Sequence, residues 1–376
     1  MIVMHIIIGL DIGGAELMLK RLVEYQTEKS LCQHHVVSLT GIGKLGLLLQ
    51  KKGVKVDALN MKGFFDIPRV FINLQRIIRN HQPDIVQTWL YHSDFLGGLA
   101  AFTLKKRRII WGIRGTDIPQ SHFSTTGLLI LFSSILSRFI PTKIVCCAES
   151  ARIAHIKKGY YKKKMIVIPN GYNLNNFNNS PELKKKARAA FGFAHNDIII
   201  GIVARYDPLK DYKNFINAAT IVAKNVKNAK IFMIGHGVDL SNSFFKSLLN
   251  KNGVADKFLL VGQQEDIPFC LAAMDIFCLS SKKEGFPNVV CEAMAMKIPC
   301  LVTDAGAASE IVGKTGIVVA PKDSIILAKA LETMIKKGEM ERNRLGELAR
   351  LRIAENYSIE IVSNQYEKLY RLEMSK

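Results

Sequence analysis

Residues 280 to 299 read SSKKEGFPNVVCEAMAMKIP, and this stretch decides the fold of the chain. The apolar run Met274 to Leu279 before it is typical of a buried strand, and Val289 to Met296 within it has the composition of a helix. Pro287 suits the first turn of that helix, where a missing N–H group costs nothing. A buried strand, a glycine-containing turn and a helix in this order indicate one unit of a parallel α/β sheet.

Two glutamates, Glu284 and Glu292, stand eight positions apart in this stretch. The free N–H groups and the positive dipole end at Gly285–Asn288 are expected to face outward from the carboxyl edge of the sheet, where open α/β folds bind phosphates and sugars. Glu284 would accept hydrogen bonds from sugar hydroxyls, and Glu292 would hold a vicinal diol such as a ribose. The alternative interpretation is a strand, a loop and an amphipathic helix with two solvated glutamates.

The order of the motifs favours the first interpretation. The chain carries Glu284-Gly-Phe-Pro, Glu292-Ala-Met-Ala, Ile298-Pro299, Thr303-Asp304-x-Gly306 and Glu310-Ile-Val in sequence. This series resembles the nucleotide-sugar site of the retaining GT-B glycosyltransferases of family 4, also called group 1, with their E-x7-E motif. The resemblance implies an α/β protein of two Rossmann-like domains with an interdomain cleft. It also implies metal-independent transfer of a sugar, with retention, from a nucleotide donor, expected to be a UDP-sugar, to an acceptor hydroxyl.

Strand-like and helix-like runs alternate along the whole chain, which indicates βαβ units and a parallel sheet. We expect an amphipathic helix from Ser121 to Arg138, and predominantly helices after Val302. Turn-forming residues gather in the middle of the chain, at Pro169-Asn170-Gly171 and in the asparagine-rich run to Pro181. Such a segment is typical of a hinge between two domains. The predicted parts are an acceptor-binding domain over 1–170, a nucleotide-sugar domain over 171–356, and a helix over 357–376 that returns to the first domain.

Several loops are expected to bind the donor. Arg205 and Lys210 follow the first strand of the second domain and resemble the family's Arg and Lys pair, which stabilises the departing diphosphate without a metal. The alternative is two exposed basic residues, which is common in a chain that has 52 of them. By resemblance, the complete expected donor set is Gly14, Arg205, Lys210, Gly235, Asp266, Ile267, Glu284, Gly285, Phe286, Pro287, Asn288 and Glu292.

The first domain carries the expected acceptor side. By resemblance, His92 lies close to the transferred sugar, although a lone histidine is more often structural. The expected acceptor set is Gly13, Glu16, His92, Arg114 and Asp117. Relatives frequently have a histidine where Arg114 stands; an arginine would suit a phosphorylated acceptor. The expected catalytic residues are Glu284, Arg205, Lys210 and His92.

Charge and composition limit the classes of molecule that the chain is expected to bind. The net charge is +20, and residues 1–170 hold 24 basic and 10 acidic residues. Such a first half attracts polyanions. We expect no nucleic acid, because no aromatic–basic interleaving appears. We expect instead an anionic membrane surface and a lipid-linked acceptor, held through the runs Lys105–Arg108 and Lys162–Lys164 and the apolar-faced stretch Leu128–Ile140.

The remaining expectations concern the cell compartment, cofactors and metal ions, and the alternative functions. The seven cysteines show no CxxC spacing, which indicates buried free thiols. Met1 to Leu10 has the pattern of a strand and not that of a signal peptide. We therefore expect a cytoplasmic protein that is peripheral on the inner face of the membrane. No cofactor is expected. No metal site is expected either, because histidines and cysteines do not cluster at ligand spacing. The rival functions are a GT-B sugar-nucleotide epimerase and a non-catalytic sugar-nucleotide binding protein.

Overall fold

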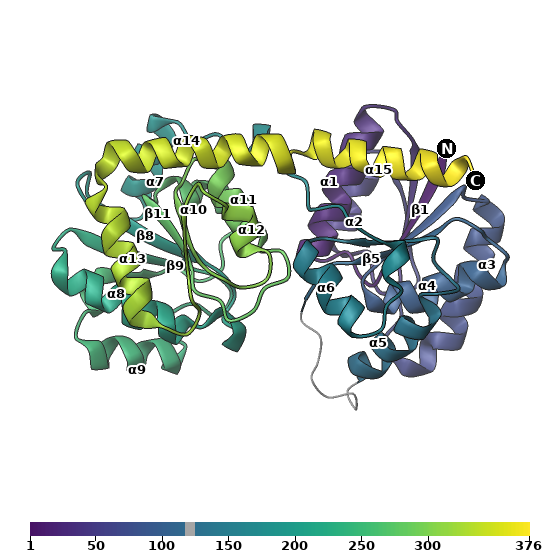
Figure 1. Ribbon diagram of the computed structural model, residues 1–376, viewed down its shortest axis with the longest axis horizontal. Coiled ribbons are helices and arrows are strands. Elements are labelled where there is room, and N and C mark those ends of the chain that lie inside the picture. Colours follow the sequence, from purple (N-terminus) through teal and green to yellow (C-terminus); the bar gives the residue numbers. More distant parts are fainter. Residues whose placement is uncertain (117–124) are drawn as a thin grey trace. The chain divides into compact units, whose positions relative to one another are not determined.

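The computed structural model describes residues 1–116 and 125–376, and the chain divides into two compact units. The first unit comprises Met1–Gly171 and Ile359–Lys376, and the second comprises Tyr172–Ser358. Each unit contains one parallel sheet with helices packed around it (Figure 1). Two such Rossmann-like α/β units are the architecture of the GT-B class.

The sheet of the first unit has seven strands in the order β3-β2-β1-β4-β5-β6-β7. Its strands are β1 (Ile2–Ile7), β2 (Gln33–Ser38), β3 (Lys55–Ala58), β4 (Ile85–Trp89), β5 (Ile109–Ile113), β6 (Lys143–Cys146) and β7 (Met165–Val167). Every strand pair is parallel. The strand order reverses between β1 and β4, and the carboxyl ends of two such strands form the usual ligand-binding crevice of a doubly wound sheet.

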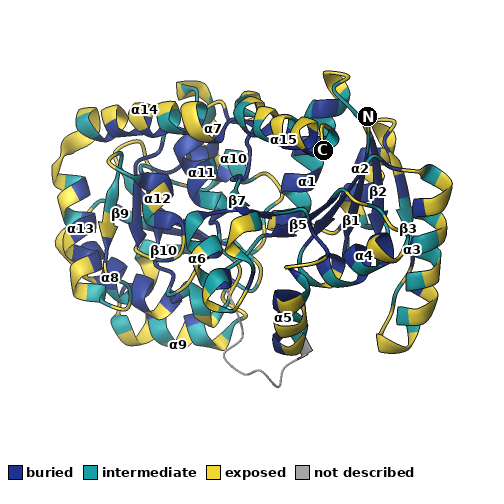
Figure 2. Cartoon of the chain, turned by 45° about the vertical axis from the view of Figure 1, so that its right-hand side comes forward, coloured by how far each residue is buried: buried dark blue, intermediate teal, exposed yellow. Residues whose placement is uncertain are grey.

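Seven helices of the first unit accompany these strands among the described residues. They are α1 (Gly14–Glu28), α2 (Gly43–Lys51), α3 (Ile67–His81), α4 (Tyr91–Thr103), α5 (Thr125–Leu136), α6 (Glu149–Lys157) and α15 (Ile359–Met374). The strands inside the sheet are almost wholly buried, as the dark blue of β1, β2 and β5 shows in Figure 2, whereas the edge strands β3 and β7 are only partly buried. This pattern is expected when helices cover both faces of a parallel sheet.

The last helix, α15, is part of the core of the first unit although it comes from the far end of the chain. Tyr366 and Tyr370 are fully buried there, and the Tyr366 ring stacks on Trp89 with centroids 6.2 Å apart. The Tyr370 hydroxyl donates to Gln87 Oε1 over 2.5 Å. Arg108 Nε donates to the Glu373 carbonyl over 2.9 Å, so α15 is joined to the sheet by polar as well as apolar contacts.

The second unit has a six-stranded parallel sheet in the order β10-β9-β8-β11-β12-β13. Its strands are β8 (Ile198–Val203), β9 (Ala229–Ile234), β10 (Phe258–Leu260), β11 (Ile276–Leu279), β12 (Cys300–Thr303) and β13 (Ile317–Val319). Its helices are α7 (Pro181–Ala190), α8 (Tyr212–Asn225), α9 (Ser243–Asn252), α10 (Ile267–Ala272), α11 (Asn288–Ala295), α12 (Ala308–Val312), α13 (Ser324–Lys336) and α14 (Gly338–Tyr357). Here the order reverses between β8 and β11, which places their two following loops side by side.

The structure corrects the sequence-based expectations at several places. Helices predominate after Val302 as expected, but the sequence analysis did not foresee one short strand, β13, which pairs with β12 and forms the edge of the second sheet. Pro287 is the N-cap of α11 and not a residue of its first turn. The expected helix over 121–138 is seen as α5, and its first residues lie outside the described part of the chain.

Two further properties of the described residues concern the cysteine thiols and membrane-spanning helices. All seven cysteines lie in the described part of the chain and are free thiols, six of them buried. Among the described residues, no helix combines the length and the apolar character needed to cross a membrane.

Candidate functional site

The expected donor loops of the second unit meet at the carboxyl edge of its sheet. These are the loops that follow β8, β9, β10, β11 and β12. Backbone hydrogen bonds join neighbouring loops: Tyr206 N–H to His236 O, Gly235 N–H to Gly262 O, Lys282 N–H to Leu209 O, and Ala307 N–H to Gly285 O. The fold therefore brings together residues that are up to a hundred positions apart in the sequence.

Glu284 and Lys210 form the centre of this edge. Lys210 Nζ lies 2.6 Å from Glu284 Oε1, and the same oxygen accepts from Ser281 Oγ over 2.6 Å. The Glu284 side chain is 8% exposed and that of Lys210 is 21% exposed. A carboxylate with so little contact with water needs a counter-charge and hydrogen bonds, and Lys210 and Ser281 supply both.

The backbone around this pair is fixed as well. Ser280 Oγ donates to the Lys210 carbonyl over 2.8 Å, which joins the loops after β8 and β11 a second time. Thr303 Oγ1, at the end of β12, donates to the Ser281 carbonyl over 2.6 Å. Ser280 and Ser281 were not predicted to be site residues, and Thr303 was noted only as part of a motif; polar residues at the end of a buried strand are the signal that would have found them.

Arg205 lies on the same loop as Lys210 but in a different environment. Its guanidinium is 70% exposed and donates to Asp207 Oδ2 over 2.9 and 3.2 Å. Partial burial raises the pKa of Asp207, but the hydrogen bonds from the Leu209 N–H and from Arg205 outweigh it and hold that pKa below its usual value. Asp207 is therefore ionised at neutral pH, and it holds an exposed cation near the carboxyl edge of the sheet.

Two glycines allow the loops to approach one another. Gly306 has φ +58°, and a Cβ there would lie 1.9 Å from the Glu284 carbonyl oxygen. Gly235 has φ +151°, and a Cβ there would lie 1.8 Å from the Ala204 carbonyl oxygen. Any side chain at these positions would push the neighbouring loop away, because real Cβ atoms do not come so close.

The segment after Glu284 leads into α11. Phe286 is buried and packs edge-on against Tyr357, with ring centroids 5.9 Å apart. Asn288 is the first residue of the helix, and its Oδ1 accepts from the Tyr172 hydroxyl over 2.5 Å. Glu292 follows one turn later and is half-buried. Both glutamates of the motif thus belong to one loop–helix segment at the carboxyl edge.

The loop after β10 ends at α10. Asp266 is the N-cap of this helix, and its Oδ1 accepts from the Phe269 N–H over 2.9 Å. Ile267 is the first residue of the helix. The cap explains Asp266 structurally, and it fixes the backbone of this expected donor loop.

In the first unit, the glycine loop follows β1 and opens α1. Gly13 is the N-cap and Gly14 the first helical residue. The carboxylate of Glu16 folds back over Gly13, since a Cβ on Gly13 would lie 2.3 Å from Glu16 Oε2. Burial raises the pKa of Glu16. The three residues thus form one compact turn at the carboxyl end of β1.

His92 lies in the first turn of α4, after β4. Its ring is partly exposed and contributes to the wall of a pocket of about 450 Å³. The other lining residues include Met61, Phe64, Phe95 and Phe132, and most of the wall is apolar. Desolvation by the surrounding protein lowers the pKa of His92, so the ring is neutral at pH 7.

Asp94 lies two residues beyond His92 and is fully buried. Its Oδ1 accepts from Thr88 Oγ1 over 2.5 Å and from the Gly112 N–H over 3.0 Å. Burial raises the pKa of Asp94 to about 7, despite these hydrogen bonds and nearby Arg114. The sequence analysis did not assign Asp94 a role; it joins the end of β4 to β5 beneath the His92 turn.

Arg114 is engaged inside the first unit. Its guanidinium carbon lies 4.3 Å from the centroid of the Trp89 ring, a cation–π contact. It donates to Asn170 Oδ1 over 3.3 Å and to the Tyr366 hydroxyl. These contacts join β5 to α15, which is a structural reason for an arginine at this position. Asp117, the other residue expected in this loop, lies outside the described residues.

Comparison with known proteins assigns the family. Residues 184–352 match the family model described as "Glycosyl transferases group 1", and residues 12–176 match "Glycosyltransferase Family 4". The chain belongs to the group 1 / family 4 glycosyltransferases. The two matches together span both units.

Individual relatives agree with this family. The chain is 27% identical over 239 residues to the Escherichia coli UDP-Gal:α-D-GlcNAc-diphosphoundecaprenol α-1,3-galactosyltransferase, a match that covers 62% of this chain and 61% of that enzyme. It is 25% identical over 305 residues to the Staphylococcus aureus capsular polysaccharide biosynthesis glycosyltransferase CapM, covering 78% of each. The crystal structure of Anabaena HepE in complex with UDP shares the fold, with a TM-score of 0.85, 21% identity and coverage of 98% and 99%.

Proposed function

We propose that this protein transfers a sugar from a UDP-linked donor to a hydroxyl of a lipid-linked saccharide, with retention of configuration and without a metal ion. The observation that carries the proposal is the group Lys210, Glu284 and Ser281 at the carboxyl edge of the second sheet, with Arg205 on the same loop. The group combines a fixed carboxylate for sugar hydroxyls with cations for a diphosphate.

The charges explain how the leaving group would be stabilised. Negative charge develops on the diphosphate as the sugar departs, and preorganised cations lower the energy of that state without reorganising during the reaction. Lys210 is held by Glu284 and Arg205 by Asp207 before any donor binds. The Lys210 ammonium group and the Arg205 guanidinium group would then contact the diphosphate, and Glu292 would bind the ribose hydroxyls.

Retention of configuration follows from a front-face reaction. The acceptor hydroxyl would attack the face of the sugar from which the diphosphate leaves, and a diphosphate oxygen would take its proton. Glu284 would then position the sugar and would not act as a covalent nucleophile. In the first unit, the neutral imidazole of His92 would accept a hydrogen bond from the transferred sugar or donate one to it.

A pocket of the first unit and the name of one relative support a lipid-linked acceptor. The pocket beside His92 is mostly apolar, which suits the hydrocarbon part of such a molecule better than a free sugar. The Escherichia coli relative is named for a diphosphoundecaprenol-linked acceptor and a UDP-galactose donor. Anabaena HepE has been crystallised with UDP and with UDP-glucose, which supports the choice of nucleotide.

Helix α5 supports a peripheral location on the inner face of the membrane. Leu128, Leu131, Phe132 and Ile135 are exposed large apolar side chains on this helix. The lysines of 162–164 lie at its end, because Lys164 Nζ donates to the Arg138 carbonyl and the Tyr161 N–H to Ser137 Oγ. An apolar helix face next to basic side chains binds anionic bilayers through two signals that act together.

The deciding experiment is product analysis. The protein is incubated in EDTA with UDP-, GDP- and ADP-sugars and an undecaprenyl-diphosphate-linked saccharide, and the products are identified by mass. The expected result is a new lipid-linked glycoside from one UDP-sugar, with the anomeric configuration of the donor as seen by NMR. An isomerised donor without acceptor would indicate the epimerase, and donor binding without any product would indicate a binding protein.

A further inference from the structure

Three side chains with metal-ligating atoms meet near the outer edge of the first sheet. They are His35 on β2, Asp57 on β3 and His81 in the last turn of α3. One ligand atom from each lies within 4.8 Å of the others. The residues are 22 and 24 positions apart in the sequence, which is why the search for ligand spacing along the chain did not find them.

The hydrogen bonding of His35 leaves one ring nitrogen without a partner. His35 Nε2 lies 2.6 Å from Asp57 Oδ2, so the carboxylate accepts the N–H at this position and Nδ1 carries the lone pair. His35 is 3% exposed, and its Nδ1 is buried without a hydrogen-bond partner. Buried polar atoms are nearly always paired, so this nitrogen requires an explanation.

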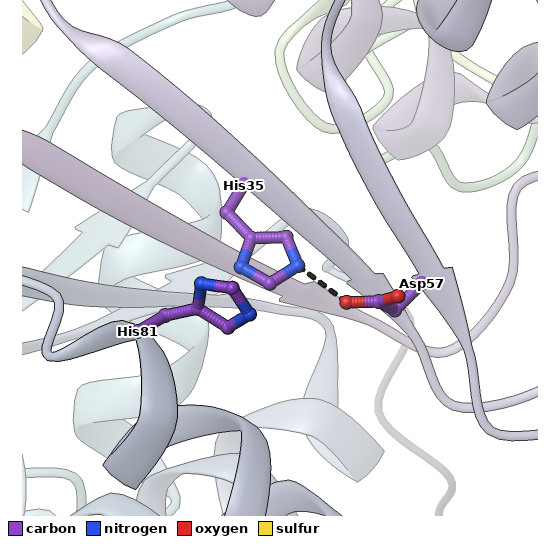
Figure 3. Close-up of side chains that lie close together, drawn as sticks. All are labelled: His35, Asp57 and His81. Atoms are coloured by element: carbon purple, nitrogen blue, oxygen red, sulfur yellow. Dashed lines mark hydrogen bonds and ion pairs between the residues drawn. The ribbon is translucent and has the colours of Figure 1, made fainter.

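The unpaired nitrogen is directed at the second histidine. Figure 3 shows His35 between Asp57 and His81, with Nε2 toward the carboxylate and the other ring nitrogen on the side of His81. The two imidazole rings are 4.4 Å apart between centroids and nearly perpendicular. Because Asp57 lies at Nε2, the lone pair of Nδ1 is left on the side of the second imidazole.

We propose that His35 and His81 bind a divalent transition metal ion of the zinc class, with Asp57 orienting His35 as the carboxylate behind the ligand. A carboxylate that accepts the N–H of a ligating imidazole is the usual outer partner in zinc sites, because it fixes the tautomer and raises ligand basicity. Zinc–nitrogen distances of about 2.0 to 2.1 Å require the two rings, now nearly perpendicular and 4.4 Å apart between centroids, to turn until one nitrogen of each faces the ion. Water completes the coordination.

The position of the site separates it from the proposed sugar transfer. His35 and Lys55 are paired near the start of β2 and β3, and His81 ends α3 just before β4 begins. The site therefore lies toward the amino-terminal side of the sheet, whereas Gly13 and His92 follow the carboxyl ends of β1 and β4. A metal ion here would stabilise the short edge strand β3 and would not contact a donor or an acceptor.

Lys55 provides a directional test. Its exposed ammonium group lies 3.0 Å from His81 Nε2, so it competes with a metal ion for that histidine and repels it electrostatically. Removing this charge should strengthen metal binding, whereas a purely structural role for the cluster predicts no such effect. At about 5 Å in water, one positive charge near a doubly charged ion corresponds to roughly a tenfold change in affinity.

The experiment uses the full-length chain, free of affinity tags and treated with EDTA. Zn²⁺ binding is measured by calorimetry, and Co²⁺ is added as a spectroscopic probe of coordination. We expect one ion per chain, loss of binding in His81→Gln, about 10- to 100-fold weaker binding in Asp57→Asn, and about tenfold tighter binding in Lys55→Met. His195→Gln, an exposed histidine in the second unit, is the matched control and should bind as the wild type does.

Two results would overturn the proposal. One is Zn²⁺ binding of equal affinity in the wild type and in His81→Gln, which would assign the ion to thiols or other histidines. The other is unchanged or weaker binding in Lys55→Met. Because the readout is binding and not glycosyl transfer, either result leaves the proposed function of the protein untouched.

Discussion

The ion pair between Lys210 and Glu284 leads to a quantitative prediction. Lys210→Met leaves a carboxylate that is 8% exposed, without its counter-charge from Lys210 but with the hydrogen bond from Ser281 in place. Removing one partner of such a buried pair destabilises proteins by about 3 to 5 kcal/mol. We expect about 3 kcal/mol here, because Ser281 remains. In a unit of this size, that loss lowers the melting temperature by roughly 6 to 12 °C.

The double variant isolates the pair. Glu284→Gln keeps the shape and the Ser281 hydrogen bond, and Lys210, at 21% exposure, still reaches water, so this change should cost only about 1 kcal/mol. Lys210→Met combined with Glu284→Gln removes both charges and should cost less than the sum of the two single changes. The expected coupling energy is about 2 kcal/mol. Lys213→Met, an exposed lysine on α8, is the control and should change stability by less than about 0.5 kcal/mol.

The assay exploits the position of the tryptophans. Both Trp89 and Trp111 lie in the first unit, so their fluorescence during urea unfolding follows that unit, while circular dichroism follows both. The Lys210 and Glu284 variants should move the dichroism transition, and additive single effects, with a coupling below about 0.5 kcal/mol, would refute the reasoning. Glu284→Gln should retain partial activity, whereas Glu284→Ala should be nearly inactive.

Four further predictions concern the proposed reaction, the membrane and the buried carboxylate Asp94. Arg205→Ala and Lys210→Ala should each lower kcat by an amount equivalent to roughly 3 kcal/mol while activity in EDTA stays near normal; loss of turnover in EDTA that Mg²⁺ restores would contradict the metal-free mechanism. Glu292→Ala should weaken the binding of UDP, measured by calorimetry, and with it the inhibition by UDP; an unchanged UDP affinity would exclude the ribose contact. Vesicles that contain phosphatidylglycerol should sediment the protein at low salt but not at high salt, and less so after Lys105, Lys106 and Arg107 are neutralised. Arg108 is left intact because it holds α15, and absence of binding at low salt would favour a soluble acceptor. Asp94 has a folded-state pKa of about 7, above its unfolded value, so the free energy of unfolding should fall as pH rises from about 4 to 7; Asp94→Asn should flatten this dependence in urea titrations, and an unchanged slope would argue against the raised pKa.

Local sequence was sufficient to predict the elements with strong periodicity. The buried run before Ser280 and the helix after Pro287 were expected within one or two residues of their observed bounds. Some of the short or glycine-containing elements were missed. Strands β7 and β13 have three residues each, too few for a pattern, and α2 carries Gly43 and Gly46, which weaken its helical signal.

The side-chain contacts of the site depended on tertiary structure that no local pattern shows. The sequence indicated that Lys210 and Glu284 belong to one site, but their direct ion pair depends on β8 and β11 being neighbours in the sheet. Arg114 was expected to face an acceptor phosphate, yet Trp89 and Tyr366 surround its guanidinium, and Tyr366 is 252 positions away. The His35, Asp57 and His81 cluster was missed for the same reason.

The return of α15 to the first unit has a consequence for biosynthesis. The ribosome must add the 203 residues from Tyr172 to Met374 before α15 is complete, which takes about 10 to 40 s at roughly 5 to 20 residues per second. During this time the first unit lacks Tyr366 and Tyr370, so the apolar surface that they cover is open to water and to other nascent chains. The second unit, continuous in sequence from Tyr172 to Ser358, emerges whole before this happens. The half of the protein that is made first is therefore the half that finishes folding last.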